Sequence, residues 1–359
     1  MVVGAVECRA FRNLVEARTE LAAGVIVVHG PNGAGKTNLL EAIYFGLTGR
    51  SFRTGNDRDL IAYGEEGARV ELELAEGGSL LAALDRSGER RHLLSGRPLA
   101  GDPGERPLVS VFHPDRLQLV KGAPAHRRAH LDRLCGAIWP ARSDLRRRFG
   151  RTLAQRNALV ARIRAGLGSV DSLPSWDERL ATEAAPLIEA RSEAVEALSA
   201  PFADLAGRLG LAKAEISYRP RAAAGGDELA EELARRRGQD LGRAYTSYGP
   251  QLDEVEFRFG AKQLRRFASQ GQQRLALLAL LFAERAALLE AGRAAPLMLL
   301  DDVMSELDSA HRELLVSLLE GAGQSVISAT ETGHVPSASA LRIEVRGGAL
   351  TTAPTLRAA

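Results

Sequence analysis

The spacing of apolar residues changes from strand-like to helical near both ends of the chain. An apolar run at 24–28 leads through a glycine-rich turn into residues 36–45, whose apolar side chains recur with the period of a helix. The alternation returns late in the chain, with strands predicted at 297–300 and 325–327 and a helix at 309–319 between them. Both ends of the chain are therefore predicted to be α/β in character.

Between these ends the pattern first favours strands. Two short segments at 69–75 and 79–84 alternate apolar and polar residues and are separated by glycine-containing turns, which predicts a small antiparallel sheet. A run of apolar residues at 107–112 predicts one more buried strand. The sequence up to this point is therefore expected to be rich in strands.

Beyond Pro114 the sequence becomes helical in character. Arg-rich and Ala/Leu-rich segments predict helices at about 126–165 and 176–209. Breaks are expected at Pro140, Pro174 and Pro201. A strand predicted at 253–259 then precedes a helix at 271–291.

These patterns predict an α/β protein with two lobes. Residues 1–118 and 293–359 are expected to form a mixed α/β lobe, and residues 119–292 a second, mainly helical lobe. No long coiled coil is expected, because no heptad pattern is sustained.

The composition excludes several classes of protein. The chain has 359 residues, of which 45% are hydrophobic, as in a folded protein with an ordinary core. Cys8 and Cys135 are too few for a disulfide framework, and no group of Cys and His has the spacing of a metal site. The start lacks a signal-peptide pattern and no apolar run is long enough to span a bilayer, so we expect a cytoplasmic protein without a membrane partner.

The formal net charge of +2 hides an uneven distribution. Between residues 116 and 164, thirteen Arg or Lys stand against two Asp, a local net charge of +11 that leaves −9 for the remaining chain. A basic helical segment of this kind is typical of contact with a nucleic-acid backbone. The candidate DNA contacts are Arg127, Arg128, Arg142, Arg146, Arg147, Arg148 and Arg151. Two alternatives stay open: these arginines solvate a helix face or pair with acidic residues, and Arg127 and Arg128 join the lobes.

The segment from Gly30 to Thr37 matches the phosphate-loop pattern G-x-x-x-x-G-K-[ST] and stands between a predicted strand and a predicted helix. Glycines let backbone N–H groups surround the phosphates, the Lys36 ammonium neutralises the β/γ oxygens, and the Thr37 hydroxyl binds Mg²⁺. The predicted nucleotide-binding residues of the loop are Gly30, Pro31, Asn32, Gly33, Ala34, Gly35, Lys36, Thr37 and Asn38.

Two carboxylates, Asp301 and Asp302, follow the apolar strand predicted at 297–300. A carboxylate in this place is the expected second protein ligand of Mg²⁺, so Thr37 and Asp301 are the predicted metal ligands. Asp302 is predicted to polarise the water that attacks the γ-phosphate, and with Lys36 it completes the predicted catalytic residues. The alternative is that both carboxylates cap the next helix.

A second anion-binding helix end is predicted at 269–272. There Ser269, Gln270, Gly271 and Gln272 open a long apolar helix. Because one γ-phosphate needs only one phosphate loop, this second helix end suggests contact with a nucleotide bound by a partner subunit. The alternative is that Ser269 is an ordinary N-cap.

Together these motifs resemble the ATPase head shared by ABC-type and SMC-type proteins, and in detail the RecF family of recombination mediators. The resemblance also rests on segments outside the loop, the strand end and the helix end. They are Phe11-Arg-Asn13, residues 112–122 and 124–132, Tyr248-Gly-Pro250, and residues 299–308. The matching motifs extend over nearly the whole chain.

The resemblance implies an ABC-type ATPase head with a nucleotide-binding α/β lobe and a largely helical second lobe. It implies a weak DNA-dependent ATPase that uses ATP and Mg²⁺, forms an ATP-dependent homodimer and binds double-stranded and gapped DNA. RecO and RecR are the implied protein partners in loading RecA. Recombinational repair, replication maintenance and SOS induction are the implied roles.

The resemblance also implies roles for single residues. The segment 269–272 would reach the γ-phosphate bound by the other subunit, and Arg12 and Asn13 would flank the base and ribose. The segment from Phe112 to Asp115 falls where related heads carry their Q-loop. The implied D-loop consists of Ser305, Glu306, Leu307 and Asp308.

Three departures from related proteins affect these expectations. The family usually has His-Arg-Asp after Gly-Pro, whereas this chain has Gln251-Leu252-Asp253, so any contact of that His or Arg is in question. Asp302 replaces the Glu of transporter ATPases and is one methylene shorter. Residues 325–330 lack the switch His of transporters. Slow hydrolysis, with ATP acting mainly as a dimer switch, is therefore expected.

Two other classes of ATPase stay as alternatives. An ABC transporter subunit would need a membrane partner and a signature much nearer the phosphate loop than Ser269 is to Thr37. An SMC-like structural ATPase would carry long coiled-coil arms in place of the Arg-rich segment.

Overall fold

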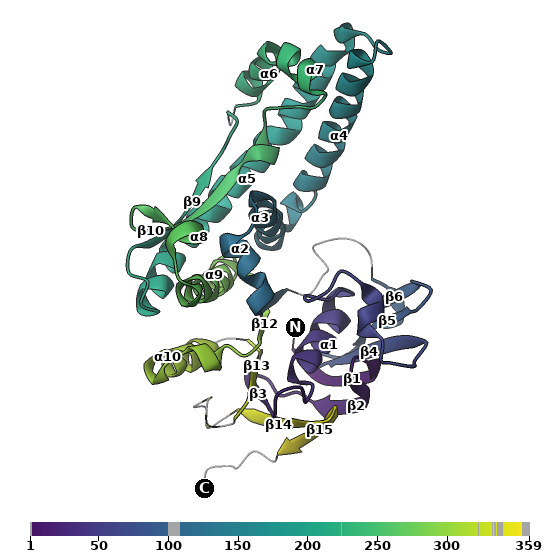
Figure 1. The fold of residues 1–359 in the computed structure, drawn as a ribbon, viewed down its shortest axis with the longest axis vertical. Coiled ribbons are helices and arrows are strands. Elements are labelled where there is room, and N and C mark those ends of the chain that lie inside the picture. The colour runs from purple at the N-terminus through teal and green to yellow at the C-terminus, as the bar shows by residue number, and fades with distance from the viewer. Residues whose placement is uncertain are drawn as a thin grey trace. The chain divides into compact units, whose positions relative to one another are not determined.

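The computed structural model describes residues 2–99, 108–223, 225–321, 323–331, 333, 335 and 340–353. The chain folds into two compact units (Figure 1). Met1–Arg116 and Gly292–Ala359 form the first, called here the α/β unit, and Leu117–Ala291 form the second, called here the helical unit. The predicted lobe boundaries lie within two residues of these bounds.

A six-stranded sheet in the α/β unit has the order β15-β14-β3-β13-β12-β8. Its strands are β3 (Val25–His29), β8 (Val109–Phe112), β12 (Leu297–Leu300), β13 (Ser325–Ala329), β14 (Leu341–Arg346) and β15 (Ala349–Ala353). All neighbouring strands are parallel except β14 and β15, which form an antiparallel hairpin. Every residue of β12 and of β13 is buried, as expected for central strands of a parallel sheet.

A second, antiparallel sheet of the same unit has the order β2-β1-β4-β5-β6-β7. Its strands are β1 (Val3–Phe11), β2 (Leu14–Glu20), β4 (Gly67–Leu74), β5 (Ser79–Asp85), β6 (Arg90–Leu94) and β7 (Arg97–Pro98). The predicted strands at 69–75 and 79–84 form its centre as β4 and β5. The spacing of apolar residues did not reveal β1 and β2, which extend this sheet on one side.

Helix α1 (Lys36–Thr48) packs against strands of both sheets. Its side chains Leu39, Leu40 and Ile43 are fully buried in one apolar core with residues of both sheets. The α/β unit also contains α10 (Ser309–Glu320), which connects β12 to β13. The single core keeps the N-terminus of α1 fixed against the ends of the parallel strands.

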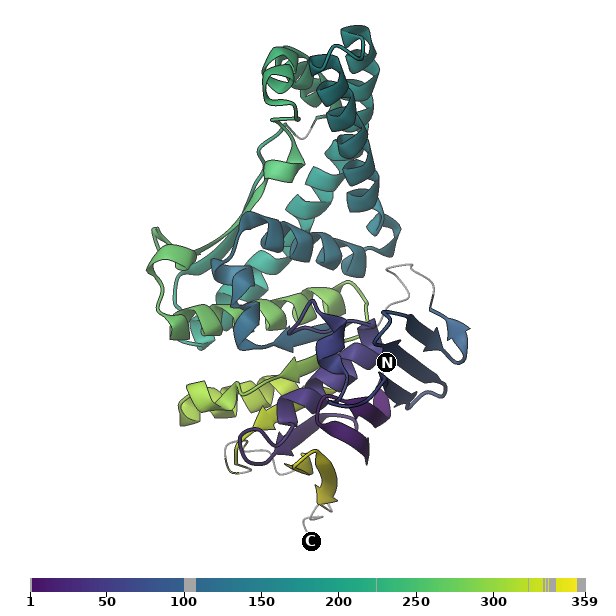
Figure 2. The same cartoon turned by 45° about the vertical axis from the view of Figure 1, so that its right-hand side comes forward.

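The helical unit contains eight helices among the residues described. They are α2 (Gln118–Lys121), α3 (Pro124–Ile138), α4 (Leu145–Arg164), α5 (Leu173–Arg208), α6 (Gly226–Arg235), α7 (Arg237–Arg243), α8 (Leu264–Phe267) and α9 (Gln270–Glu290). A small antiparallel sheet has the order β11-β10-β9, formed by β9 (Ala214–Arg219), β10 (Glu254–Phe259) and β11 (Lys262–Gln263). Helices α4 and α5 lie side by side (Figure 2).

The prolines act differently from one another. The predicted helix at 126–165 is interrupted at Pro140, as expected, and becomes α3 and α4. Pro174 lies in the first turn of α5, where backbone N–H groups make no hydrogen bond within the helix, so its missing N–H costs nothing. The break expected at Pro201 is wrong, because α5 continues through it. Buried neighbours such as Leu198 and Phe202 hold this turn in place despite the lost hydrogen bond.

Buried arginines tie the helical unit together. Arg156, which is 0% exposed, donates hydrogen bonds of 2.8 Å to both Asp177 and Asp240, and so links α4 to α5 and α7. Arg191 of α5 pairs with Asp132 of α3 at 2.7 Å and with Asp253 at 2.9 Å. Among the residues described, no helix has the length and apolar character needed to cross a membrane.

Candidate nucleotide-binding site

The parallel strands end at the same edge of the sheet, and the predicted motifs follow these ends. The phosphate loop comes after β3, Asp301 after β12 and His113 after β8, and the register of the strands places these ends side by side. Ligands of open parallel sheets bind at this edge. The motifs thus meet although Thr37 and Asp301 are far apart in the sequence.

Two glycines of the phosphate loop are required by close contacts. Gly30 has φ +147°, and a Cβ there would lie 2.2 Å from the carbonyl oxygen of Val345. Gly35 has φ +121°, and a Cβ would lie 2.8 Å from Oδ1 of Asn13. A side chain at either position would therefore push the loop away from the segments that support it.

Lys36 arches back over the loop. Its Nζ donates hydrogen bonds of 2.8 Å to the carbonyl oxygen of Gly30 and 3.0 Å to that of Pro31. Partial burial lowers the pKa of Lys36, while the carboxylates of Asp302 and Asp301 act in the opposite direction. Its two hydrogen bonds go to neutral carbonyl groups, so charged phosphate oxygens are stronger partners and can take over these bonds.

Thr37 and Asp301 are in direct contact. The Thr37 hydroxyl lies 2.9 Å from Oδ1 and 3.0 Å from Oδ2 of Asp301. Asp301 is buried, with only 5% of its surface exposed. The hydroxyl of Ser328 donates to the same carboxylate at 2.7 Å, and Nε2 of His113 lies 3.6 Å from it. Two hydroxyl donors therefore orient this buried carboxylate toward the head of the loop.

The donor set fits Mg²⁺. A hydroxyl and a carboxylate are the hard oxygen ligands that this ion prefers, and two protein ligands leave the other positions to phosphate oxygens and water. Within the described residues, no group of three or more His, Cys, Asp or Glu could hold a metal ion by itself. Thr37 and Asp301 are thus suited to an ion that arrives with a nucleotide.

Asp302 has an unusual backbone. Its φ is +50°, and its N–H donates to the hydroxyl of Ser328 at 2.9 Å, while its side chain is exposed. Neither Asp301 nor Asp302 caps the next helix, because Asp308 is the N-cap of α10. The capping alternative is therefore wrong, and the left-handed backbone turns two successive carboxylates in different directions.

The turn at Arg12 and Asn13 borders the loop. The amide of Asn13 donates to the carbonyl oxygen of Ala34 at 3.0 Å and accepts from Asn38 at 2.8 Å. Arg12 instead makes two hydrogen bonds of 3.0 Å with the fully buried Glu41. Contact of Arg12 with base or ribose remains a prediction, whereas its role in fixing α1 is structural.

The implied D-loop, residues 305–308, follows Asp302 in the chain and contacts it through Ser305. Ser305 donates to the carbonyl oxygen of Asp302 at 3.0 Å, and the carboxylate of Asp308 accepts the N–H of His311 at 2.9 Å. The hydrogen bonds from the backbone N–H and the side chain of His311 lower the pKa of Asp308. Leu307 is buried, and the side chain of Glu306 lies outside the described part of the chain.

The signature segment, in the helical unit, opens α9. Ser269 is the N-cap: its hydroxyl accepts the N–H of Gln272 at 3.2 Å, and the side chain of Gln272 accepts the N–H of Ser269 at 2.9 Å. Ser269, Gln270 and Gly271 are exposed. A Cβ at Gly271 would meet nothing nearer than 3.9 Å, so packing within the chain does not require glycine there.

Comparison with known proteins gives the family. A family model described as an AAA domain matches residues 5–90. The DNA replication and repair protein RecF of Heliobacterium modesticaldum is 35% identical over 349 residues, 93% of each chain. That of Moorella thermoacetica is 37% identical over 322 residues, 88% of this chain and 86% of the relative. The chain belongs to the RecF family.

Solved structures agree with the predicted RecF-type fold. A structure titled as the recombination mediator protein RecF with ATP in the RecFOR pathway has a TM-score of 0.84 and 27% identity, covering 98% of this chain and 97% of that one. An SMC head bound to a domain of ScpA has a TM-score of 0.60 at 16% identity, which shows the fold alone. The predicted ABC-type ATPase head is confirmed, and the described residues contain no long coiled coil of the SMC kind.

Seven arginines of the basic segment of this RecF-family chain fall into three groups. Arg127 and Arg156 are buried. Arg142, Arg146 and Arg148 face the carboxylates of Glu193, Asp132 and Glu183 at 2.6, 3.6 and 2.9 Å. Arg147 and Arg151 are exposed and have no carboxylate within ion-pair distance among the described residues.

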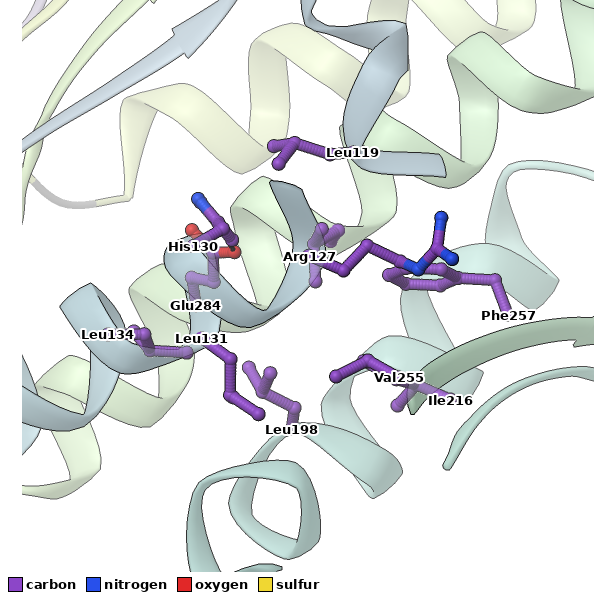
Figure 3. Close-up of a pocket in the computed structure, with 11 residues that line it drawn as sticks. Leu119, Arg127, His130, Leu131, Leu134, Leu198, Ile216, Val255, Phe257 and Glu284 are labelled. Carbon is purple, nitrogen blue, oxygen red and sulfur yellow. Dashed lines mark hydrogen bonds and ion pairs between the residues drawn. The ribbon is translucent and has the colours of Figure 1, made fainter. Parts of the chain in front are cut away.

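The structure corrects the prediction for Arg127. Its guanidinium bonds Glu254 at 2.7 Å and the carbonyl oxygen of Gly122 at 2.6 Å, and the residue is 4% exposed. Figure 3 shows it beside the apolar side chains that line a cavity of the helical unit. Arg128 is half-buried and donates to the carbonyl oxygen of Asp253 at 2.8 Å. Arg127 is therefore buried away from DNA, and its hydrogen bonds link α3 to β10 within the helical unit.

Sequence reasoning missed Ser328 as a residue of the site and gave His113 only as part of the implied Q-loop segment. Ser328 holds both Asp301 and the backbone of Asp302, and His113 lies against Asp301. The useful signal was their position: each stands at the end of a strand adjacent to β12. A polar residue at the end of a buried parallel strand marks the functional edge even when no motif includes it.

Proposed function

We propose that this RecF-family chain is an ATP-dependent DNA-binding protein of DNA replication and repair, with ATP and Mg²⁺ controlling its dimerisation. The observation that carries the proposal is the contact of Thr37 with Asp301 at the head of the phosphate loop, 2.9 Å apart. The names and titles of the relatives, which include DNA replication and repair and a RecF structure with ATP, support the same function.

In the proposed ATP site, Lys36 and the loop N–H groups bind the β- and γ-phosphates. Thr37 and Asp301 would hold Mg²⁺, which would neutralise phosphate charge when bound. Asp302 orients the attacking water and accepts its proton, because its carboxylate is exposed beside the loop lysine. The side chain is shorter than Glu, so we expect weak hydrolysis that acts as a switch. The family resemblance adds the expectation that hydrolysis depends on DNA.

The proposed dimer brings the signature segment to the nucleotide of the partner subunit. The N–H groups at the start of α9, with Ser269 and Gln272, would bind the γ-phosphate. Exposed Gly271, which no packing within the chain requires, leaves room for a phosphate to approach. Ser269 is an N-cap as well, and the two roles are compatible because a cap hydroxyl can accept one bond and donate another.

Double-stranded and gapped DNA is the proposed nucleic-acid ligand. The candidate contacts that are not buried are Arg128, Arg142, Arg146, Arg147, Arg148 and Arg151. From the resemblance we propose RecO and RecR as partners in loading RecA. Action in the cytoplasm, in recombinational repair, replication maintenance and SOS induction, follows from the same resemblance.

Sedimentation of the protein with and without ATP, and with a gapped duplex, tests the proposal. We expect a monomer without nucleotide, a dimer with ATP, and a heavier complex when the duplex is added. The Lys36→Met variant should stay monomeric under all conditions. The proposal fails if ATP changes neither the mass of the wild-type protein nor its binding to the duplex.

A further inference from the structure

We infer that one face of α4 in the helical unit, formed by Arg147, Arg151 and Arg162 with Ala154 and Ala158 between them, binds the phosphate backbone of duplex DNA. The inference rests on the proposed DNA-binding function and specifies its surface. This set is called here the α4 face.

The composition of α4 is unusual. Its 20 residues include seven arginines and no Asp or Glu. One arginine, Arg156, is used inside the helical unit. The others form an exposed array of cations on a helix that has no acidic residue of its own to balance them.

Helix geometry separates the two sides of α4. The buried residues are Leu145, Phe149, Thr152, Arg156 and Val160. Each residue of the α4 face follows one of these buried residues by two positions, and all five residues of the face are exposed. Two residues correspond to about 200° of rotation at 3.6 residues per turn, so this face points away from the packed side.

Ion pairing separates the α4 face from its neighbours. Arg148 forms an ion pair with Glu183 at 2.9 Å, and Arg142 forms one with Glu193 at 2.6 Å. In the described part of the chain, Arg147, Arg151 and Arg162 have no carboxylate within 4 Å; Arg162 makes only a 3.3 Å bond to the carbonyl oxygen of Leu167. These charges are available for a ligand.

Stability does not explain the α4 face. Arg147 and Arg151 stand one turn apart, where like charges repel and destabilise a helix. Ala154 and Ala158 have small side chains, so no bulky group projects from the α4 face between Arg151 and Arg162. A rod-shaped polyanion can therefore lie close to the helix axis. The charges extend over about 22 Å, at 1.5 Å per residue, which is long enough to follow several phosphates.

The test compares two triple variants that remove the same charge. The face variant carries Arg147→Ala, Arg151→Ala and Arg162→Ala. The control variant carries Arg208→Ala, Arg219→Ala and Arg235→Ala, which lie outside the candidate DNA contacts and face Asp204, Glu256 and Glu232. Binding of a labelled duplex is measured with ATP over a series of salt concentrations, and circular dichroism confirms that α4 is still folded.

We expect the face variant to lower the log–log salt slope by up to about 2.7, at about 0.9 for each phosphate contact, and the control variant to change it little. A third variant with Lys at the three face positions should keep the slope. The inference is overturned if the salt slope of the face variant is unchanged, or if the slope of the control variant falls equally. It is also overturned if the variant with Lys at the three face positions loses the slope. If the wild-type protein binds no duplex, the proposed function itself fails.

Discussion

The two units use buried charge in different ways. In the α/β unit the buried carboxylate of Asp301 is surrounded by groups at the edge of a sheet, where a ligand can join them. In the helical unit Arg156 and Arg191 are paired with aspartates from neighbouring helices and are closed off from solvent. The comparison teaches that the buried carboxylate at the sheet edge can accept a ligand, whereas the buried carboxylates of the helical unit are already paired with arginines.

The same contrast holds for the two parts of the proposed composite nucleotide site. The phosphate loop is supported by Val345 and Asn13, which limit its movement. The signature helix end is satisfied by its own capping box and stands exposed. We therefore expect changes in the loop to affect the monomer, and changes in the signature to affect only the dimer.

Asp302→Asn should have the largest effect on chemistry. Asn tolerates the left-handed backbone of this position, so the fold is kept while the proton acceptor is lost. We expect kcat for ATP hydrolysis to fall by about 10²- to 10⁴-fold, with ATP affinity nearly unchanged. Steady-state phosphate release and nucleotide titration measure the two quantities.

The matched control is Asp59→Asn, which removes an exposed carboxylate of the α/β unit outside the predicted nucleotide site. Asp59 accepts hydrogen bonds from Thr54 and Asn56, so kcat for this variant should stay within a few-fold of the wild type. Equal losses for both variants would contradict the role given to Asp302.

Arg156→Met tests the framework of the helical unit. The change leaves Asp177 and Asp240 buried without their shared cation and should cost about 3–5 kcal/mol in the free energy of unfolding. Chemical unfolding followed by circular dichroism measures the loss. Arg208→Met, at an exposed pair 3.8 Å from Asp204, should cost less than about 1 kcal/mol. Comparable losses would remove the distinction between buried and exposed arginines.

Lys36→Met should weaken ATP binding by the monomer about 100-fold, near 2.7 kcal/mol, because the main counter-charge to the phosphates disappears. Calorimetric titration measures the affinity. Lys121→Met removes an exposed lysine of the helical unit and should leave it unchanged. Wild-type affinity in the Lys36 variant would show that the loop lysine is not a phosphate ligand.

Ser269→Asp distinguishes an N-cap from a γ-phosphate ligand. Asp caps helices as well as Ser does, so α9 should keep its stability. Next to a partner's phosphate, however, the new charge should weaken ATP-induced dimerisation by at least about 10-fold, or 1.4 kcal/mol, through like-charge repulsion. Sedimentation with ATP measures the dimer, and nucleotide affinity of the monomer serves as the control. Normal dimerisation would leave Ser269 with its capping role alone.

Much of the candidate site could be predicted from local sequence. The phosphate loop needs glycines, a lysine and a hydroxyl in a continuous segment, so its chemistry is visible in order along the chain. Asp301 could be found because it ends an apolar strand. The contacts of Ser328 and His113 with Asp301 could not be predicted, because they depend on strand pairing between distant segments. The hairpin of β14 and β15 was missed for the same reason.

The fate of the arginines shows the limit most clearly. Local charge predicted a basic segment, but burial of Arg127 depends on Glu254, which is 127 positions later. The break expected at Pro201 failed because packing of α5 outweighed a local rule. The residues adjacent to Arg127 and Pro201 in the sequence do not indicate the pairing with Glu254 or the packing of α5.

The sequence by itself determined the phosphate loop with its flanking strand and helix, the strands that became β4, β5, β8, β12 and β13, and the uneven charge, because period, backbone freedom and ionisation are local properties. Only the tertiary structure decided which side chains meet at the sheet edge and which arginines stay exposed. Those outcomes depend on pairing and burial between segments far apart in the chain. A net charge of +11 in the sequence thus becomes, in the fold, an internal framework and one unpaired face of α4.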